Sequence, residues 1–265
     1  MYAILNELLS DKKGGATFSC FGIWHLIYIF LVIAVIISLL LILGNKSENA
    51  KMHAIDISLN VAFGLYILDF FLMPFAYGEI DLEKFPFHIC TAMCVMSFLS
   101  RHNKFLYRFR FQFAILGFIS NFVYFIYPAG VGWYQIHPLS YRVIQTLIFH
   151  ATMMTYGLFV ILFEIKDLKW KDCLKELIVL ICMTLWALLG NILYNGTIGE
   201  YSHNFNWFFV LQDPFYLLPK EIAPYLMPFV TPLAFFIVTL LVYIVYFGTR
   251  RILECKAEVF TEENV

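Results

Sequence analysis

The sequence predicts an all-α fold, a polytopic seven-transmembrane-helix bundle with the N-terminus outside and the C-terminus inside. Of the 265 residues, 61% are hydrophobic and only 14% are charged. The apolar residues gather in runs instead of alternating with polar residues, which is typical of a membrane protein. The basic residues gather in alternate connections between these runs, and this bias indicates the orientation.

Six runs are long enough to span a bilayer, since a spanning helix needs about 20 apolar residues. They cover residues 21–44, 54–77, 105–128, 139–165, 174–194 and 224–248. The first run is longer than the apolar part of a signal peptide and no small-residue cleavage site follows it, so we expect no removable signal peptide. Residues 1–20 are then an extracytoplasmic segment, 21–250 the membrane domain and 251–265 a cytoplasmic tail.

A seventh apolar run, residues 86–100, is too short for an ordinary span. A helix of about 15 residues covers about 22 Å at 1.5 Å per residue, less than the hydrocarbon core. We therefore expect other helices to surround it, or a water-accessible hollow to meet its end. Pro86 suits the first turn of this helix, where the missing N–H costs nothing.

The distribution of Lys and Arg supports seven crossings. With seven spans, 13 of the 18 basic residues fall on the side that holds the C-terminus. They are Lys46, Lys51, Arg101, Lys104, Arg108, Arg110, Lys166, Lys169, Lys171, Lys175, Arg250, Arg251 and Lys256. If the short run did not cross, this asymmetry would weaken, so we predict that it spans.

Composition also excludes several classes of function. The net charge of −1 gives no basic field for nucleic acid, and no nucleotide-binding or zinc-finger spacing is present. The six cysteines are scattered and predict no disulfide framework. Between the last two runs, the outer loop 195–223 mixes aromatic and amide residues, which favours an interfacial or partly re-entrant segment.

Polar residues within the spans gather in the predicted outer half. Six spans contribute to this set, which comprises His25, Asp69, His88, Cys90, Asn121, Gln145, His150, Asn191 and Asn195. The inner half offers mainly Asp56, Ser58 and Asn60. Because intramembrane polar groups usually face a bundle interior or cavity, the asymmetry predicts one outward-facing polar pocket. The alternative is that each side chain only satisfies a neighbouring helix.

Cys90 stands out in this set because a thiol becomes a nucleophile when a base removes its proton. His88 is two residues away on the same helix and points elsewhere. His150 lies about 16 Å into its own span and meets Cys90 if the short span starts below the surface. A lone cysteine is more often a buried apolar residue. Zinc binding by His88, Cys90, Cys94 and His150 is a rival, although compact Cys-x-x-Cys pairs are missing.

Three motifs resemble the YwaF-like bacterial integral membrane proteins, which belong with the animal transmembrane acyltransferases that make polyunsaturated ether phosphatidylethanolamine. "FGIWHLIYIF" with His25 is similar to the family's P-x-H-L-x-x-L, "FPFHIC" with Pro86, His88 and Cys90 to LPLHLC, and "LIFHA" with His150 to FF-x-x-H. "NFNWFF", with Asn206, is the nearest match to a G-T-N-Y before the last span and lacks its glycine.

The resemblance implies that Cys90 and His150 form an acyl-transfer pair. The expected function is an acyl-chain transferase or hydrolase that acts on phospholipids through a thioester. The expected pocket residues are His25, Asp69, His88, Gln145, Asn191 and Asn206, with the last two amides as oxyanion donors. Membrane phospholipids and lysophospholipids are the expected partners, with no cofactor, no metal and no nucleic acid, in the cell membrane.

Two other classes remain open. In a transporter, the same polar groups would line a substrate path and Asp69 would bind a proton or cation. That reading also requires polar groups in the inner half. A seven-helix receptor agrees with the span count and orientation alone, which is an argument from fold.

Overall fold

Five helices in the computed structural model are long and apolar enough to cross a membrane. The structure describes residues 9, 11, 15–77, 82–128, 136–165, 168–198 and 201–262, without the side chains of 76–77, 197–198, 201–203 and 253–262. Most of the predicted N-terminal segment, the end of the predicted tail, Lys166 and the side chain of Lys256 therefore lie outside this description. The chain is a multi-pass membrane protein, and its seven-span count and orientation stay predictions.

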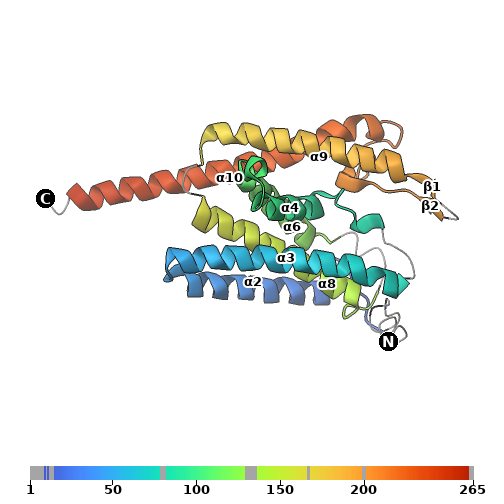
Figure 1. The fold of residues 1–265 in the computed structure, drawn as a ribbon, viewed down its shortest axis with the longest axis horizontal. Helices are drawn as coiled ribbons and strands as arrows, with labels where there is room; N and C mark the ends of the chain where they lie inside the picture. Colours follow the sequence, from blue (N-terminus) through green and yellow to red (C-terminus); the bar gives the residue numbers. More distant parts are fainter. Residues whose placement is uncertain are drawn as a thin grey trace.

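Each predicted span corresponds to one described helix. These are α2 (Ile23–Gly44), α3 (Glu48–Tyr77), α4 (Ile89–Ser100), α6 (Arg110–Ile126), α8 (Tyr141–Phe159), α9 (Cys173–Tyr194) and α10 (Ala223–Glu262). The five candidate spans contain α2, α3, α8, α9 and α10, whereas α4 and α6 are shorter apolar helices. In Figure 1, α9 and α10 form one side of the bundle, α2 and α3 form the other, and α4 and α6 lie between them.

The boundaries differ from the predicted ones where capping groups intervene. The predicted fourth span is divided, because the Asn103 side chain accepts hydrogen bonds from Phe105 N and Leu106 N and starts a separate turn, α5 (Lys104–Tyr107). α8 ends in a π-helical turn, η2 (Val160–Glu164). A 3₁₀ turn, η3 (Trp170–Asp172), precedes α9. α10 continues to Glu262, so much of the predicted tail is helical.

Pro86 is not in the first turn of α4, contrary to the prediction. α4 begins at Ile89 with His88 as its N-cap, after the 3₁₀ turn η1 (Leu82–Lys84). The Pro86 carbonyl instead accepts a hydrogen bond of 2.8 Å from Trp186 Nε1. The helix has 12 residues, or about 18 Å at 1.5 Å per residue, and is shorter than the sequence indicated.

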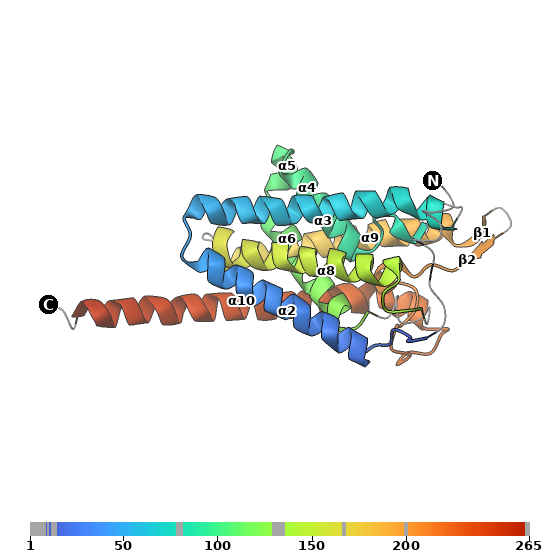
Figure 2. The ribbon, with the colours of Figure 1, turned by 90° about the horizontal axis from the view of Figure 1, so that it is seen from below.

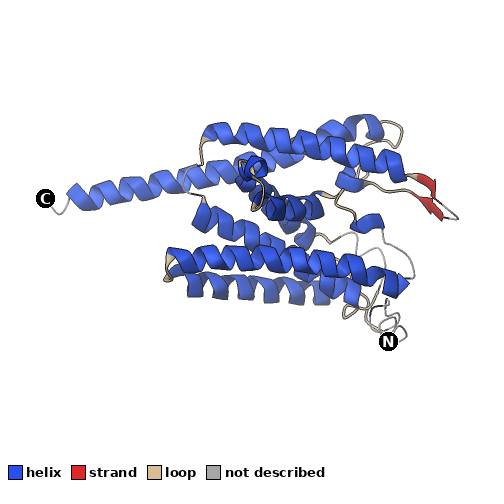
Figure 3. Cartoon of the chain, in the orientation of Figure 1, coloured by secondary structure: helices blue, strands red, loops and turns tan. Residues whose placement is uncertain are grey.

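The predicted all-α class is confirmed, and the described strands are limited to one short hairpin in the outer loop. β1 (Gly196–Ile198) and β2 (Tyr201–His203) pair antiparallel and extend from the end of α9 (Figure 3). A 3₁₀ turn, η4 (Trp207–Phe209), follows them. The hairpin and α10's C-terminal turns lie at opposite ends of the bundle (Figure 1).

The two short helices are at the centre of the packing. α6 packs against α4 and α8, and α3 packs against both α4 and α8. Figure 2 shows α4 and α6 running obliquely across the long helices. α2 is peripheral, since only 11% of the residues in its most apolar stretch are buried. The long helices thus present apolar side chains outward, and α4 and α6 can carry polar groups inside.

A glycine permits the closest contact between α6 and α8. A Cβ atom at Gly157 would lie 2.6 Å from Ala114 O and 2.7 Å from Phe118 Cβ, well inside ordinary contact distance. His150 lies two helical turns from Gly157, and Asn121 lies two turns from Ala114 on the facing antiparallel helix. The close approach therefore helps to set the distance between His150 and Asn121.

Candidate functional site

Cys90 is the second residue of α4 and lies beneath the outer loop. Its thiol interacts with the Ser120 side chain of α6. Ser120 Oγ also donates to Gly117 O at 3.3 Å. Because α4 packs on α6, the polar contact of the thiol is with this neighbouring helix rather than with its own N-cap.

His150, in the middle of α8, is buried and held in one orientation. Its Nδ1 lies 2.6 Å from Asn121 Oδ1. Asn121 Nδ2 donates to Gly117 O at 2.7 Å, so its oxygen faces the ring and accepts the Nδ1 proton. The Tyr124 ring stacks on the imidazole with a centroid distance of 3.9 Å. In the neutral ring, Nε2 then carries the lone pair and can act as a base.

Adjacent residues on α6 connect the thiol and the imidazole. Ser120 contacts Cys90, Asn121 contacts His150, and Asn121 Nδ2 lies 3.4 Å from Ser120 Oγ. A nucleophile, a base and a group that orients the base are the parts of a catalytic triad. The sequence placed Asn121 in the outer half but did not assign it this role, and Ser120 was missed. The sequence feature that could have indicated both residues is the polar pair Ser120-Asn121 inside an apolar run.

A charged pair lies beside this site. Lys84 Nζ is 2.7 Å from Asp69 Oδ2, and both Lys84 and His88 interact electrostatically with His150. Asp69 Oδ1 is buried and has no hydrogen-bond partner among the described residues. Tyr66 donates its hydroxyl to Lys84 O at 2.9 Å. The sequence identified Asp69 but not Lys84, because Lys84 falls in a connection.

His88 anchors the outer loop rather than serving Cys90. As the N-cap of α4, it accepts a hydrogen bond from Phe208 N through Nδ1, at 3.3 Å. Phe208 and the following Phe209 have φ values of 55° and 52°, in the left-handed region that costs energy for a bulky residue. The buried Phe208 ring packs against Phe235 of α10. The segment after β2 therefore packs against the bundle, and its place relative to the membrane stays a prediction.

Asn191 and Asn195 hold the same loop along α9. Asn191 exchanges two hydrogen bonds with the Trp207 backbone, at 3.1 and 3.3 Å. Asn195 exchanges two with the Phe205 backbone, at 2.6 and 3.0 Å. Asn191 and Asn195 are four residues apart on a helix, which is a rise of about 6.0 Å. Their partners, Trp207 and Phe205, are two residues apart in an extended chain, which is about 6.6 Å. The spacing of the two amides therefore matches the spacing of the backbone groups that they bind.

Asn206, the other predicted oxyanion donor, closes the next turn of the loop. Its Oδ1 accepts from Leu211 N and Gln212 N, and its Nδ2 donates to Gln212 O at 2.9 Å. Both predicted donors, Asn191 and Asn206, are thus bonded to loop backbone. We do not place them in the reaction site.

Two further predicted pocket residues make contacts of other kinds. His25 is fully buried, accepts from Phe21 N at 2.9 Å and donates to Phe125 O at 3.0 Å. It joins the start of α2 to the end of α6. Gln145 is 8% exposed, and its Oε1 accepts from the Thr146 hydroxyl. The structure therefore relates Asp69 and His88 to His150, and relates Cys90 to His150 only through the adjacent Ser120 and Asn121. It gives no described contact that brings His25 or Gln145 to them.

The helices also hold polar groups beyond those that the sequence indicated for the inner half. Glu176 is fully buried in the first turn of α9, and Tyr243 donates to it at 3.4 Å. Glu164 lies 3.3 Å from Arg101 and 3.2 Å from Arg110. Both carboxylates stand near the ends of predicted spans, and the sequence identified neither of them. Both lie in helical segments that the apolar runs had indicated, Glu164 at the end of η2 and Glu176 in the first turn of α9.

Comparison with known sequences gives one result. No curated protein and no solved structure matches this chain. The family model that matches is that of the TMEM164 family, over residues 20–249, which cover α2, the candidate site and most of α10. Together with its apolar helices, this match shows that the chain belongs to the TMEM164 family of multi-pass membrane proteins.

Proposed function

We propose that this protein is an acyl-chain transferase or hydrolase of the cell membrane that acts on phospholipids through Cys90, His150 and a thioester intermediate. The observation that carries the proposal is the 2.6 Å contact between His150 Nδ1 and Asn121 Oδ1. This contact orients the buried imidazole so that its other ring nitrogen, Nε2, can take a proton. His150 lies on α8, which packs against α6, the helix that contacts the Cys90 thiol.

In the first half-reaction, His150 Nε2 takes the thiol proton and Cys90 Sγ attacks the ester carbonyl carbon of a phospholipid. The carbonyl oxygen becomes an oxyanion, and the Lys84 ammonium is the nearby described positive charge that can stabilise it. The ester C–O bond then breaks, and the lysophospholipid oxygen leaves with the proton from His150. The acyl chain remains on Cys90 as a thioester.

In the second half-reaction, His150 takes a proton from a lysophospholipid hydroxyl or from water. The resulting oxygen attacks the thioester carbonyl, the C–S bond breaks, and the proton returns to sulfur. Transfer and hydrolysis differ only in the acceptor. Asn121 keeps the imidazole in the required tautomer throughout, as a positioning residue.

Trapping the intermediate tests the proposal. The purified protein is incubated with phospholipid carrying a labelled acyl chain, without lysophospholipid, and label released by neutral hydroxylamine is measured. We expect label on Cys90 and a fall of about 10²–10⁴-fold in its rate of formation in His150→Ala. Asn121→Ala should lower the rate less and shift its pH profile, whereas Asn121→Asp should restore part of the rate.

Cys94→Ala is the matched control, since Cys94 is buried one helical turn further along α4. It should retain the label. Equal labelling of Cys90→Ser and of the parent would overturn the proposal. So would turnover of phospholipid without any hydroxylamine-sensitive label.

The second candidate function is transport of a small ion. It is favoured by Glu176, a carboxyl group inside the bundle that contacts Tyr243 and is fully buried, since intramembrane ionisable residues mark ion pathways. Proton or Na⁺ flux into liposomes that depends on Glu176 and is lost in Glu176→Gln would support it. Flux equal to that of empty liposomes would exclude it.

A further inference from the structure

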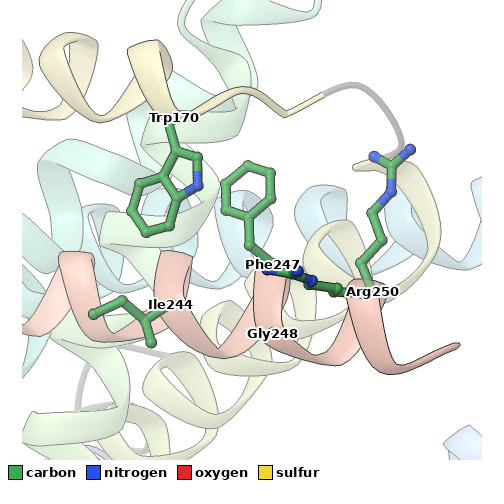
Figure 4. Close-up of a pocket in the computed structure, with 6 residues that line it drawn as sticks. Trp170, Ile244, Phe247, Gly248 and Arg250 are labelled. Carbon is green, nitrogen blue, oxygen red and sulfur yellow. The ribbon is translucent and has the colours of Figure 1, made fainter. Parts of the chain in front are cut away.

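A groove lies at the end of the bundle opposite to the candidate site, between the start of α9 and the later part of α10. We call it the Trp170 groove. It is lined by Trp170, Ile244, Phe247, Gly248, Arg250 and Arg251 (Figure 4). None of these residues takes part in the proposed acyl transfer, so the groove is a separate feature of the molecule.

The apolar wall of the groove is preformed. Trp170 stacks on Phe247 with a centroid distance of 4.9 Å and an interplanar angle of 19°, and its ring lies 6.3 Å from that of Tyr243. A Cβ atom at Gly248 would meet nothing within 4 Å. The aromatic side chains are therefore held against one another, and there is open space at Gly248.

The open end of the groove is positively charged. Arg250 and Arg251 are exposed on α10, where the apolar part of that helix ends. Lys169 and Lys171 flank Trp170 and are also exposed. The neighbouring Asp172 carboxylate is engaged by Lys175 Nζ at 2.7 Å and by Lys169 N at 2.8 Å.

An exposed apolar surface continues from the groove along both helices. Leu174 and Ile178 on α9 are 60% and 50% exposed, and Leu241 and Val245 on α10 are 55% and 66% exposed. In a membrane these side chains face the acyl chains of lipids. The site thus has a cationic end, an aromatic wall and an apolar continuation, in the order in which a phospholipid presents phosphate, glycerol backbone and acyl chains.

We propose that the Trp170 groove binds an anionic glycerophospholipid. Its phosphate lies between the Arg250 and Arg251 guanidinium groups, and its acyl chains follow the outer faces of α9 and α10. Guanidinium groups suit phosphate oxygens because they offer two parallel N–H donors. Basic sites between helices at the membrane surface favour acidic over zwitterionic headgroups.

Quenching of Trp170 fluorescence by brominated lipids tests this inference. The full chain is reconstituted in phosphatidylcholine vesicles that contain brominated phosphatidylglycerol or brominated phosphatidylcholine at the same mole fraction. The Trp170 signal is the difference between the parent and Trp170→Phe. We expect half-maximal quenching at a several-fold lower mole fraction of brominated phosphatidylglycerol, and we expect high salt to reduce this preference.

Two double variants remove the same number of charges. Arg250→Gln/Arg251→Gln should abolish the preference, whereas Lys104→Gln/Arg108→Gln, exposed in and just after α5, should keep it. Quenching by brominated phosphatidylcholine shows that Trp170 still faces lipid in each variant. Equal quenching by the two lipids in the parent, or an unchanged preference in the Arg250/Arg251 variant, would overturn the inference.

Discussion

Replacing Gly157 by alanine should separate α6 from α8 and weaken the candidate site from a distance. The new methyl group would lie 2.6 Å from Ala114 O, and ordinary contact begins at 3.4 Å. The helices must therefore move apart by about 0.8 Å at this point. If they move as rigid bodies, the His150–Asn121 contact lengthens from 2.6 Å to about 3.4 Å, beyond a good hydrogen bond.

The expected cost in stability combines two opposing effects. Overpacking of a close contact costs about 1–3 kcal/mol, and replacing glycine by alanine within a helix returns up to about 1 kcal/mol. We expect a net loss of about 1–2 kcal/mol, which lowers Tm by roughly 2–8 °C for a chain of this size. Thermal unfolding followed by tryptophan fluorescence in detergent measures this change.

Gly64→Ala is the matched control, because Gly64 is helical and a Cβ there meets nothing within 4 Å. It should leave Tm unchanged or raise it slightly. A Gly157→Ala protein that unfolds at or above the Tm of the parent would refute the reasoning about helix contact. A normal rate of Cys90 acylation in that variant would show that the distance between α6 and α8 does not limit the reaction.

Three more predictions concern the loop and the opposite end. Asn191→Ala leaves the buried Trp207 N–H without its acceptor, at a cost of about 1–3 kcal/mol, and should make the loop sensitive to chymotrypsin while Gln145→Ala does not. Glu164→Gln removes the carboxylate shared by two arginines and should lower Tm more than loss of either arginine alone. The pKa of Asp213 is lowered because the backbone N–H groups of Phe215, Leu217 and Leu218 donate to its carboxylate. Its contribution to loop stability is therefore present above the unfolded-state pKa and is lost as pH falls through the folded-state pKa. Pepsin cleavage at 215–218 should therefore rise in that acidic range, and Asp213→Asn should be cleaved readily at higher pH; equal cleavage of both proteins throughout would contradict this.

The sequence predicted the helices well because most of them are long apolar runs, which a bilayer requires to be helical. The division of the fourth span was harder to predict from the sequence, because it depends on one side chain, Asn103, that caps the short helix α5 next to the apolar run. Pro86 was misplaced for a related reason. A proline fits either the first turn of a helix or the approach to it, and only the contact with Trp186, 100 residues away, decides between them.

The candidate site could be predicted only in part. Cys90, His88 and His150 were found from residue type and motif, whereas Ser120 and Lys84 were not, because their positions depend on how α6 and η1 pack. The amides show the same limit. Asn191 and Asn206 have the composition of oxyanion donors, but the loop that follows α9 folds back and takes up their hydrogen bonds, which no local pattern reveals.

Helix α4 is fixed at both ends, and this limits how the protein can admit a large substrate. At its start, His88 accepts from the backbone of the outer loop at Phe208. Just past its end, Arg101 lies 3.5 Å from Asp56 of α3 and 3.3 Å from Glu164. The helix can therefore neither slide along its axis nor turn about it without breaking contacts at one end. If the proposed reaction takes place at Cys90, its substrate has to enter by movement of the parts around α4, above all the loop that contacts α10, while α4 keeps its position.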